Sequence, residues 1–194
     1  MRKGRVEISP GFLLLAAWLN YMDRQGIFVL TLIGCVFHEL CHLGILRLCK
    51  VPIRCIRITA VGAEIRVDRG MSYLTEMGAA LAGPLGNLFL AFLASRVPGG
   101  ALFAGVNLAL GLFNLVPAGR LDGGRFLYCA LSLLLGPEWG ERVSGLISNL
   151  CLAVLCLAGG WSFGRRGSLT LALISIWMVF SLKDIAGYWR KWVK

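Results

Sequence analysis

Long apolar runs joined by short basic connectors are the feature that most restricts what this chain can fold into. The run at residues 26–48 is long enough, at about 1.5 Å per helical residue, to cross a hydrocarbon core about 30 Å thick. Apolar residues make up 57% of the sequence and charged residues 15%, whereas about a quarter of an ordinary soluble domain is charged. In lipid each backbone polar group needs a partner within the chain, which favours helices. We therefore expect an all-α polytopic membrane protein.

About six transmembrane helices are predicted. The runs lie at about residues 11–22, 26–48, 76–97, 101–116, 143–160 and 168–182. The first run is too short to cross unless its helix extends back toward Val6 or lies shallowly in the membrane. A further apolar helix at residues 126–136 is followed by a polar interruption at residues 137–142. No internal repeat is visible, and residues 1–194 are predicted to form a single intramembrane domain.

Between the second and third runs, the composition changes to short segments that mix β-branched and charged residues. Two such segments, at residues 53–58 and 64–68, flank the small residues at 60–63. This pattern is typical of a short β-hairpin at the membrane surface, although a polar connector would show a similar composition.

The net charge of +10 is explained by membrane topology. Basic residues flank the apolar runs instead of forming one patch with aromatic residues, so no nucleic-acid partner is expected. If the N-terminus is cytoplasmic, most of the 20 basic residues fall in loops on the cytoplasmic side. We therefore predict a multi-pass protein of the bacterial cytoplasmic membrane with both termini in the cytoplasm.

A potential metal site lies in the second run, in the sequence His38-Glu39-Leu40-Cys41-His42. Residues i and i+4 of a helix share one face, so the two imidazoles can close on one metal ion. A catalytic zinc site uses three protein ligands and keeps one position open for a water, whose pKa the ion lowers toward about 7. Glu39, next to the first histidine, is placed to act as general base on that water.

Two other interpretations of this motif stay open. A five-residue pattern recurs by chance, and a lone helix histidine is more often a core residue than a ligand. Against this, the chain has two histidines, both in the motif, and polar groups within an apolar segment are costly and usually functional. Cys41 is a further candidate ligand, but the seven cysteines, with no C-x-x-C pair, are interpreted as small apolar residues outside any disulfide framework.

The fourth run ends in an irregular segment that carries a carboxylate. Pro117 and the glycines around Asp122 stop a regular helix, and irregular backbone at membrane depth is tolerated where it is buried or lines a wet cavity. A surface turn is the alternative, because glycine neighbours favour it too. The other acidic residues are expected in or beside polar or basic connectors: Glu7, Asp23, Glu64, Asp68, Glu76, Glu138, Glu141 and Asp184. If the metal has a third ligand of N or O type, Asp122 is the best candidate.

The third run contains the sequence Ala-Gly-Pro-Leu-Gly-Asn at residues 82–87. Proline and glycine inside a membrane helix allow a neighbouring helix to approach closely, and Asn87 can supply a hydrogen bond across helices. Packing alone would also explain this cluster.

Together, the three motifs at residues 38–42, 82–87 and 114–124 resemble those of the site-2 protease family of intramembrane zinc metalloproteases. The size of the chain and its layout of six apolar runs are most similar to those of the bacterial sporulation branch, whose members release a sigma factor from its membrane-bound pro-form. The resemblance implies His38, His42 and Asp122 as zinc ligands and Glu39 as the catalytic base. It also implies that Asn114 and Pro117 shape the site.

The function implied is that of a zinc-dependent intramembrane endopeptidase that cleaves a membrane-embedded or membrane-associated protein near the cytoplasmic face. The partners expected are such a substrate, for example a transcription-factor pro-form, a membrane inhibitor or regulator, and the lipid bilayer. The chain departs from the family pattern at Cys41, where glycine is usual, and at Arg120, where proline is common. We expect neither the peptide-binding domain nor the nucleotide-sensing domain of other members. A membrane metal transporter or metal-binding scaffold is the alternative function.

A substrate helix must be unwound before it is cut, because its carbonyls are engaged in the helix's own hydrogen bonds. The predicted hairpin follows the metal helix directly and is the strand-like segment of the chain. We predict that its free edge, which includes Ile65 and Val67, pairs with an extended substrate by backbone hydrogen bonds.

Overall fold

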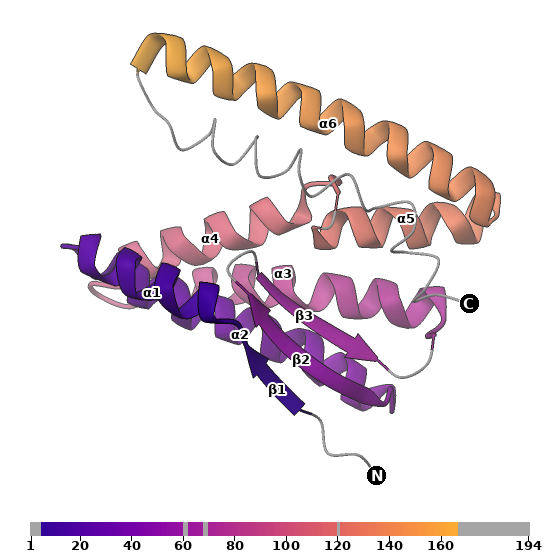
Figure 1. The fold of residues 1–194 in the computed structure, drawn as a ribbon, viewed down its shortest axis with the longest axis horizontal. Helices are drawn as coiled ribbons and strands as arrows, with labels where there is room; N and C mark the ends of the chain where they lie inside the picture. Colours follow the sequence, from indigo (N-terminus) through magenta and orange to yellow (C-terminus); the bar gives the residue numbers. More distant parts are fainter. Residues whose placement is uncertain (1–4, 60–61, 68–69, 120, 167–194) are drawn as a thin grey trace. The chain divides into compact units, whose positions relative to one another are not determined.

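A computed structural model describes residues 5–59, 62–67, 70–119 and 121–166. These residues form six helices and one small sheet, and three of the helices are long and apolar enough to cross a membrane (Figure 1). The three are α2 (Ile27–Leu48), α3 (Tyr73–Ser95) and α6 (Pro137–Arg166); α1 (Pro10–Met22) and α4 (Ala101–Leu115) are shorter and apolar. The described helices thus agree with a membrane protein, and the predicted run at residues 168–182 lies outside the described residues.

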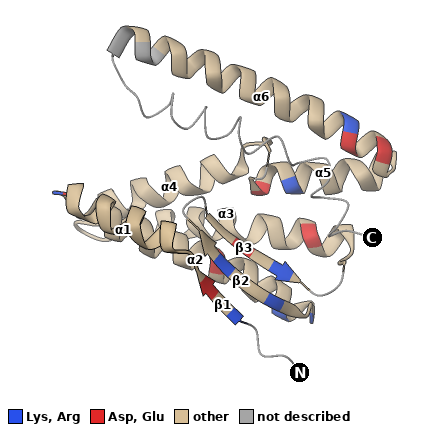
Figure 2. Ribbon diagram, viewed as in Figure 1, with Lys and Arg blue, Asp and Glu red and all other residues tan. Residues whose placement is uncertain are grey.

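Charged residues are unevenly distributed over the described elements (Figure 2). Helices α1 and α4 carry no charged residue, while each strand carries charged residues among apolar ones. Many large apolar side chains of the long helices are exposed, for example Leu40, Phe89 and Leu157. Lipid is the solvent in which such surfaces are stable.

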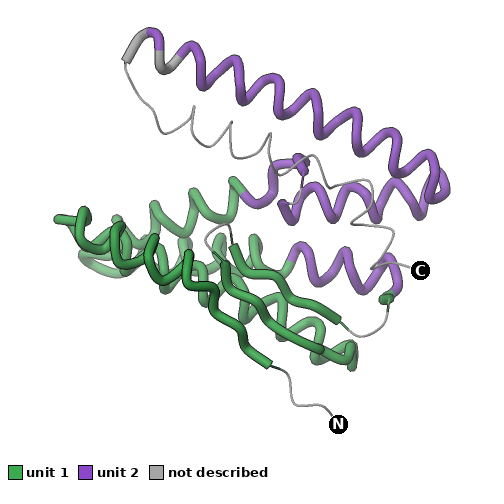
Figure 3. The backbone as a smooth tube through the Cα atoms, in the orientation of Figure 1, with its two compact units in different colours: residues 1–71, 82–113 green, residues 72–81, 114–194 purple. Residues whose placement is uncertain are grey.

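The chain divides into two compact units (Figure 3). Unit 1 comprises residues 1–71 and 82–113, and unit 2 comprises residues 72–81 and 114–194. Helix α3 contributes its first turns to unit 2 and the remainder to unit 1.

In unit 1 the sheet has the order β1-β2-β3, formed by β1 (Arg5–Ile8), β2 (Ile53–Thr59) and β3 (Gly62–Val67). Strands β2 and β3 are antiparallel, so the predicted hairpin is confirmed. Strand β1, which the sequence analysis did not predict, pairs with β2 in parallel. β3 therefore lies at one edge of the sheet.

The first helix does not extend back toward Val6, as one interpretation of its short run required. Val6 belongs to β1 and is paired with Ile56. The helix begins at Pro10, since Ser9 caps it by accepting a hydrogen bond from the amide of Phe12 at 3.2 Å, and proline suits the first helical position. This capping separates strand from helix within two residues.

Helix α2, which carries both histidines, follows Gly26, and Asp23 accepts a hydrogen bond from an amide of its first turn. The Asp23 carboxylate accepts hydrogen bonds from the backbone amides of Phe28, at 2.7 Å, and Gln25, at 3.1 Å. These bonds favour the ionised carboxylate, and the bond from Phe28 contributes most to lowering the pKa of Asp23.

The α3 and α4 segments of unit 1 pack closely at a glycine. A Cβ added at Gly111 of α4 would lie 3.0 Å from the carbonyl oxygen of Pro84 and from the side chain of Leu88, both in α3. Pro84 lies inside α3 without ending it. The predicted close approach of neighbouring helices at this motif is therefore confirmed.

In unit 2, α4 ends at Leu115 and α5 (Asp122–Leu135) begins seven residues later, so the predicted break in the helix is confirmed. A Cβ on Gly123 would collide with the carbonyl oxygen of Leu115, so this tight turn requires glycine. The predicted interruption at residues 137–142 is wrong. Pro137 starts α6 because the first helical position needs no backbone N–H donor.

Candidate metal site

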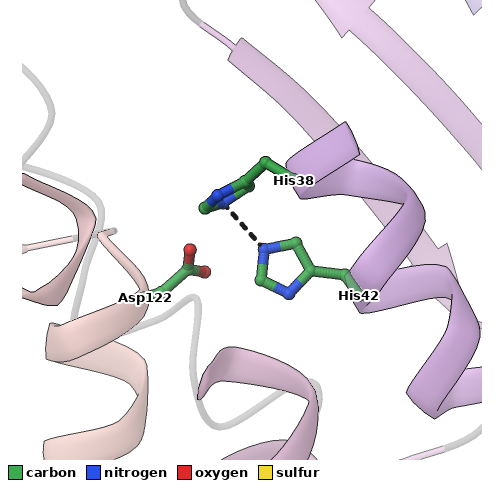
Figure 4. Close-up of side chains that lie close together, drawn as sticks. All are labelled: His38, His42 and Asp122. Carbon is green, nitrogen blue, oxygen red and sulfur yellow. Dashed lines mark hydrogen bonds between the residues drawn. The ribbon is translucent and has the colours of Figure 1, made fainter. Parts of the chain in front are cut away.

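Helix α2 places His38 and His42 on one buried face. Their exposed fractions are 7% and 4%, and their ring centroids are 4.6 Å apart. The Nε2 atoms of the two rings lie 3.0 Å from each other (Figure 4). Two ring nitrogens that converge in this way, one helical turn apart, are suited to share one metal ion.

The space in front of the two nitrogens depends on Gly83 of α3. A Cβ added at this residue would lie 2.6 Å from Nε2 of His38 and still closer to Nε2 of His42. Glycine therefore keeps open the position that a shared ion needs, since metal–nitrogen distances are about 2.0–2.1 Å. The residues of this face fit a metal ion.

Asn87 determines which nitrogen of His38 faces that space. Its Oδ1 lies 2.5 Å from Nδ1 of His38, and its amide nitrogen donates to the carbonyl oxygen of Gly34 at 3.1 Å and to Oδ1 of Asn107 at 2.8 Å. Since both amide protons of Asn87 are engaged, its oxygen faces His38 and must accept a hydrogen bond from a protonated Nδ1. Nε2 then carries the lone pair that a metal requires. The predicted hydrogen bond from Asn87 across helices is confirmed.

Glu39 follows His38 on α2 and is partly buried. Being one position along the helix, it lies beside the face that carries the histidines. Cys41, the other candidate ligand in this motif, packs elsewhere: a Cβ on Gly86 of α3 would collide with its Sγ. This placement favours a packing role for Cys41.

In unit 2, Asp122 is the first residue of α5 and is 6% exposed, so it does not lie in a surface turn. Nη1 of Arg125 donates to its Oδ1 at 3.1 Å. Arg125 also donates to Oε1 of Glu76, from Nε at 2.9 Å and from Nη2 at 2.5 Å. The guanidinium thus connects two buried carboxylates.

Glu76 does not lie in or beside a connector, so this expectation from the sequence is wrong. It is only 2% exposed, within the first turn of α3. The helix begins at Tyr73, earlier than predicted, and Arg125, the partner of Glu76, is 49 residues away in the sequence. A single sequence gives no signal for such a pair.

His38 and His42 belong to unit 1 and Asp122 belongs to unit 2. These are the three residues expected from the sequence as zinc ligands, and that they bind one ion together stays a prediction.

The remaining predicted site residues lie in other parts of the two units. Asn114 is in the last turn of α4, and Pro117, two residues beyond the helix, accepts a hydrogen bond from the hydroxyl of Ser148 at 3.4 Å. Ile65 and Val67 belong to the edge strand β3, where Val67 is 7% exposed. Their role in shaping the site or binding a substrate stays a prediction.

The fold is that of a site-2 protease. The solved structure of the site-2 protease from Methanocaldococcus jannaschii superposes with a TM-score of 0.71 and 24% identity, covering 93% of this chain and 90% of that one. No family model matches the chain.

Two curated relatives are named as zinc metalloproteases. Rip3 of Mycobacterium tuberculosis is 30% identical over 172 residues, which cover 79% of this chain and 44% of the relative. MJ0392 of M. jannaschii is 27% identical over 188 residues, which cover 89% of this chain and 54% of the relative. The chain thus spans about half the length of these relatives.

Proposed function

We propose that this chain is a zinc-dependent intramembrane endopeptidase of the site-2 protease family. The observation that carries the proposal is the convergence of two buried histidine nitrogens on a space that Gly83 leaves open. The site-2 protease fold and the two relatives named as zinc metalloproteases support it.

His38, His42 and Asp122 hold the zinc ion in this proposal. When bound, zinc supplies Lewis-acid chemistry, polarising a peptide carbonyl and activating a water for attack. Glu39 accepts the proton of the attacking water on its carboxylate and passes it to the leaving amine. Asn87 keeps the proton of His38 on Nδ1, and Arg125 orients the Asp122 carboxylate by donating to Oδ1.

The substrate in this proposal is a membrane-embedded or membrane-associated protein cut near the cytoplasmic face. It pairs as an extended strand with the edge strand β3, near Ile65 and Val67, and Asn114 and Pro117 shape the site around it. The protein lies in the cytoplasmic membrane of a bacterial cell with both termini in the cytoplasm. A transcription-factor pro-form, as in sporulation, is the kind of substrate proposed, with a membrane inhibitor or regulator as a further partner.

The experiment uses purified protein in lipid vesicles with a membrane-anchored candidate substrate. Glu39→Gln should abolish cleavage and leave zinc content unchanged, because Glu39 moves a proton and does not bind the ion. Glu138→Gln, the same change at an exposed position of α6, is the matched control and should cleave like the parent. Cleavage at the parent rate by Glu39→Gln would contradict the proposal.

A further inference from the structure

A buried chain of amide hydrogen bonds leads from His38 to Asn107 of α4. Asn87 and Asn107 are both 0% exposed. Nδ2 of Asn87 donates to Oδ1 of Asn107 at 2.8 Å, and Nδ2 of Asn107 donates to the carbonyl oxygen of Phe103 at 2.9 Å. Residue 107 was not a candidate site residue in the sequence analysis, because an asparagine in an apolar run gives no indication of its partner.

Each hydrogen bond in this series has a fixed direction from donor to acceptor. The Phe103 carbonyl can only accept, so the amide nitrogen of Asn107 faces it and the Asn107 oxygen faces Asn87. The Asn107 oxygen and the Gly34 carbonyl then both accept from Asn87, whose own oxygen is left to face His38. Reversing the Asn87 amide would place its oxygen against two other acceptors. Two backbone carbonyls therefore determine the direction of these hydrogen bonds, that of Phe103 in α4 through Asn107 and that of Gly34 in α2 directly.

We propose that Asn107 is a positioning residue, which acts through Asn87 to hold the proton of His38 on Nδ1 and so presents the Nε2 lone pair to the metal. The inference rests on the proposed zinc site at His38. Asn107 itself contacts neither metal nor substrate in this account. Loss of a partner behind a metal-bound histidine typically weakens metal affinity about 10–100-fold.

The simpler alternative is that Asn107 only holds helices together, since buried amides do this in membranes. The two roles differ in what they predict for the imidazole. A helix-packing residue affects stability, whereas a positioning residue also changes the tautomer of one named ring.

The first test measures zinc affinity by competition with a chelator. Asn107→Leu and Asn107→Ala both remove the acceptor for Asn87 but differ in side-chain volume, and each should weaken zinc binding about 10-fold. Asn149→Leu, the same change at an exposed position of α6, is the control and should bind zinc like the parent. Parent affinity in both Asn107 variants would overturn the inference.

A double variant tests whether Asn107 acts through Asn87. Asn87→Leu already removes the hydrogen bond to His38, so adding Asn107→Leu should cause no further loss of zinc affinity. Additive losses would show that Asn107 acts independently and would overturn the inference.

The tautomer can be observed directly by nitrogen NMR of protein labelled at histidine, since the chain has two histidines. In zinc-free parent protein, His38 should show a protonated Nδ1 and an unprotonated Nε2. Asn107→Ala should give a mixture of tautomers at His38, whereas the control Asn149→Leu should keep the parent tautomer. An unchanged His38 tautomer would overturn the inference. These readouts need no substrate, so a failure to cleave would count against the proposed function alone.

Discussion

Replacing Gly83 by alanine is the sharpest perturbation of the space between the histidines. The added Cβ would lie 2.6 Å from Nε2 of His38, whereas ordinary van der Waals contacts begin at 3.4 Å. The His38 ring must therefore move away by the difference, 0.8 Å, to reach an ordinary contact distance. His42 must move further, because its Nε2 is closer still. Metal–ligand distances tolerate about 0.2 Å, so at least one histidine should be lost as a ligand. We expect zinc affinity to fall more than about 100-fold, beyond the range for an outer partner.

This substitution should not lower the stability of helix α3 itself. Alanine is favoured over glycine in a helix by about 1 kcal/mol, so Gly83→Ala separates the metal site from helix stability. The assay is zinc affinity by chelator competition, together with thermal unfolding of zinc-free protein. Gly105→Ala on α4, where an added Cβ meets nothing within 4 Å, is the control and should keep parent affinity. Parent zinc affinity in Gly83→Ala would refute the assignment of this space to the metal.

Two further predictions concern the second unit and the sheet. Glu76→Gln should destabilise the protein by about 3 kcal/mol, measured by unfolding in mixed micelles, because it removes a charge partner from Arg125; parent stability would show that Asp122 alone satisfies Arg125. Proline placed singly along Gly62–Val67 should slow cleavage of a membrane substrate at the positions whose N–H groups face away from β2, with zinc content unchanged. Parent turnover in every such variant would show that β3 does not hold the substrate.

Much of this fold follows from local sequence patterns. Apolar run length predicts α2 and α3, and β-branched residues with small residues between them predict the hairpin. Pro117 and the neighbouring glycines predict the break before Asp122. These features are encoded within a few residues, so no distant contact is needed to recognise them.

The features that the sequence analysis missed depend on distant partners. Strand β1 is four residues long and exists through pairing with β2, some 50 residues away in the sequence. Glu76 is buried because Arg125 neutralises it, and Asn107 pairs with Asn87, which is 20 residues away in the sequence. The spacing of His38 and His42 could be recognised as a ligand pair, but the role of Gly83 in keeping their space open required coordinates.

In the proposed site, a single zinc ion is held by two imidazoles and a carboxylate. X-ray absorption at the zinc edge of the purified protein tests it most directly, because the seven cysteines offer sulfur as the competing donor. We predict nitrogen and oxygen neighbours at about 2.0–2.2 Å, with the imidazole scattering of two histidines. A sulfur shell at about 2.3 Å would contradict the assignment of His38, His42 and Asp122 as the ligands.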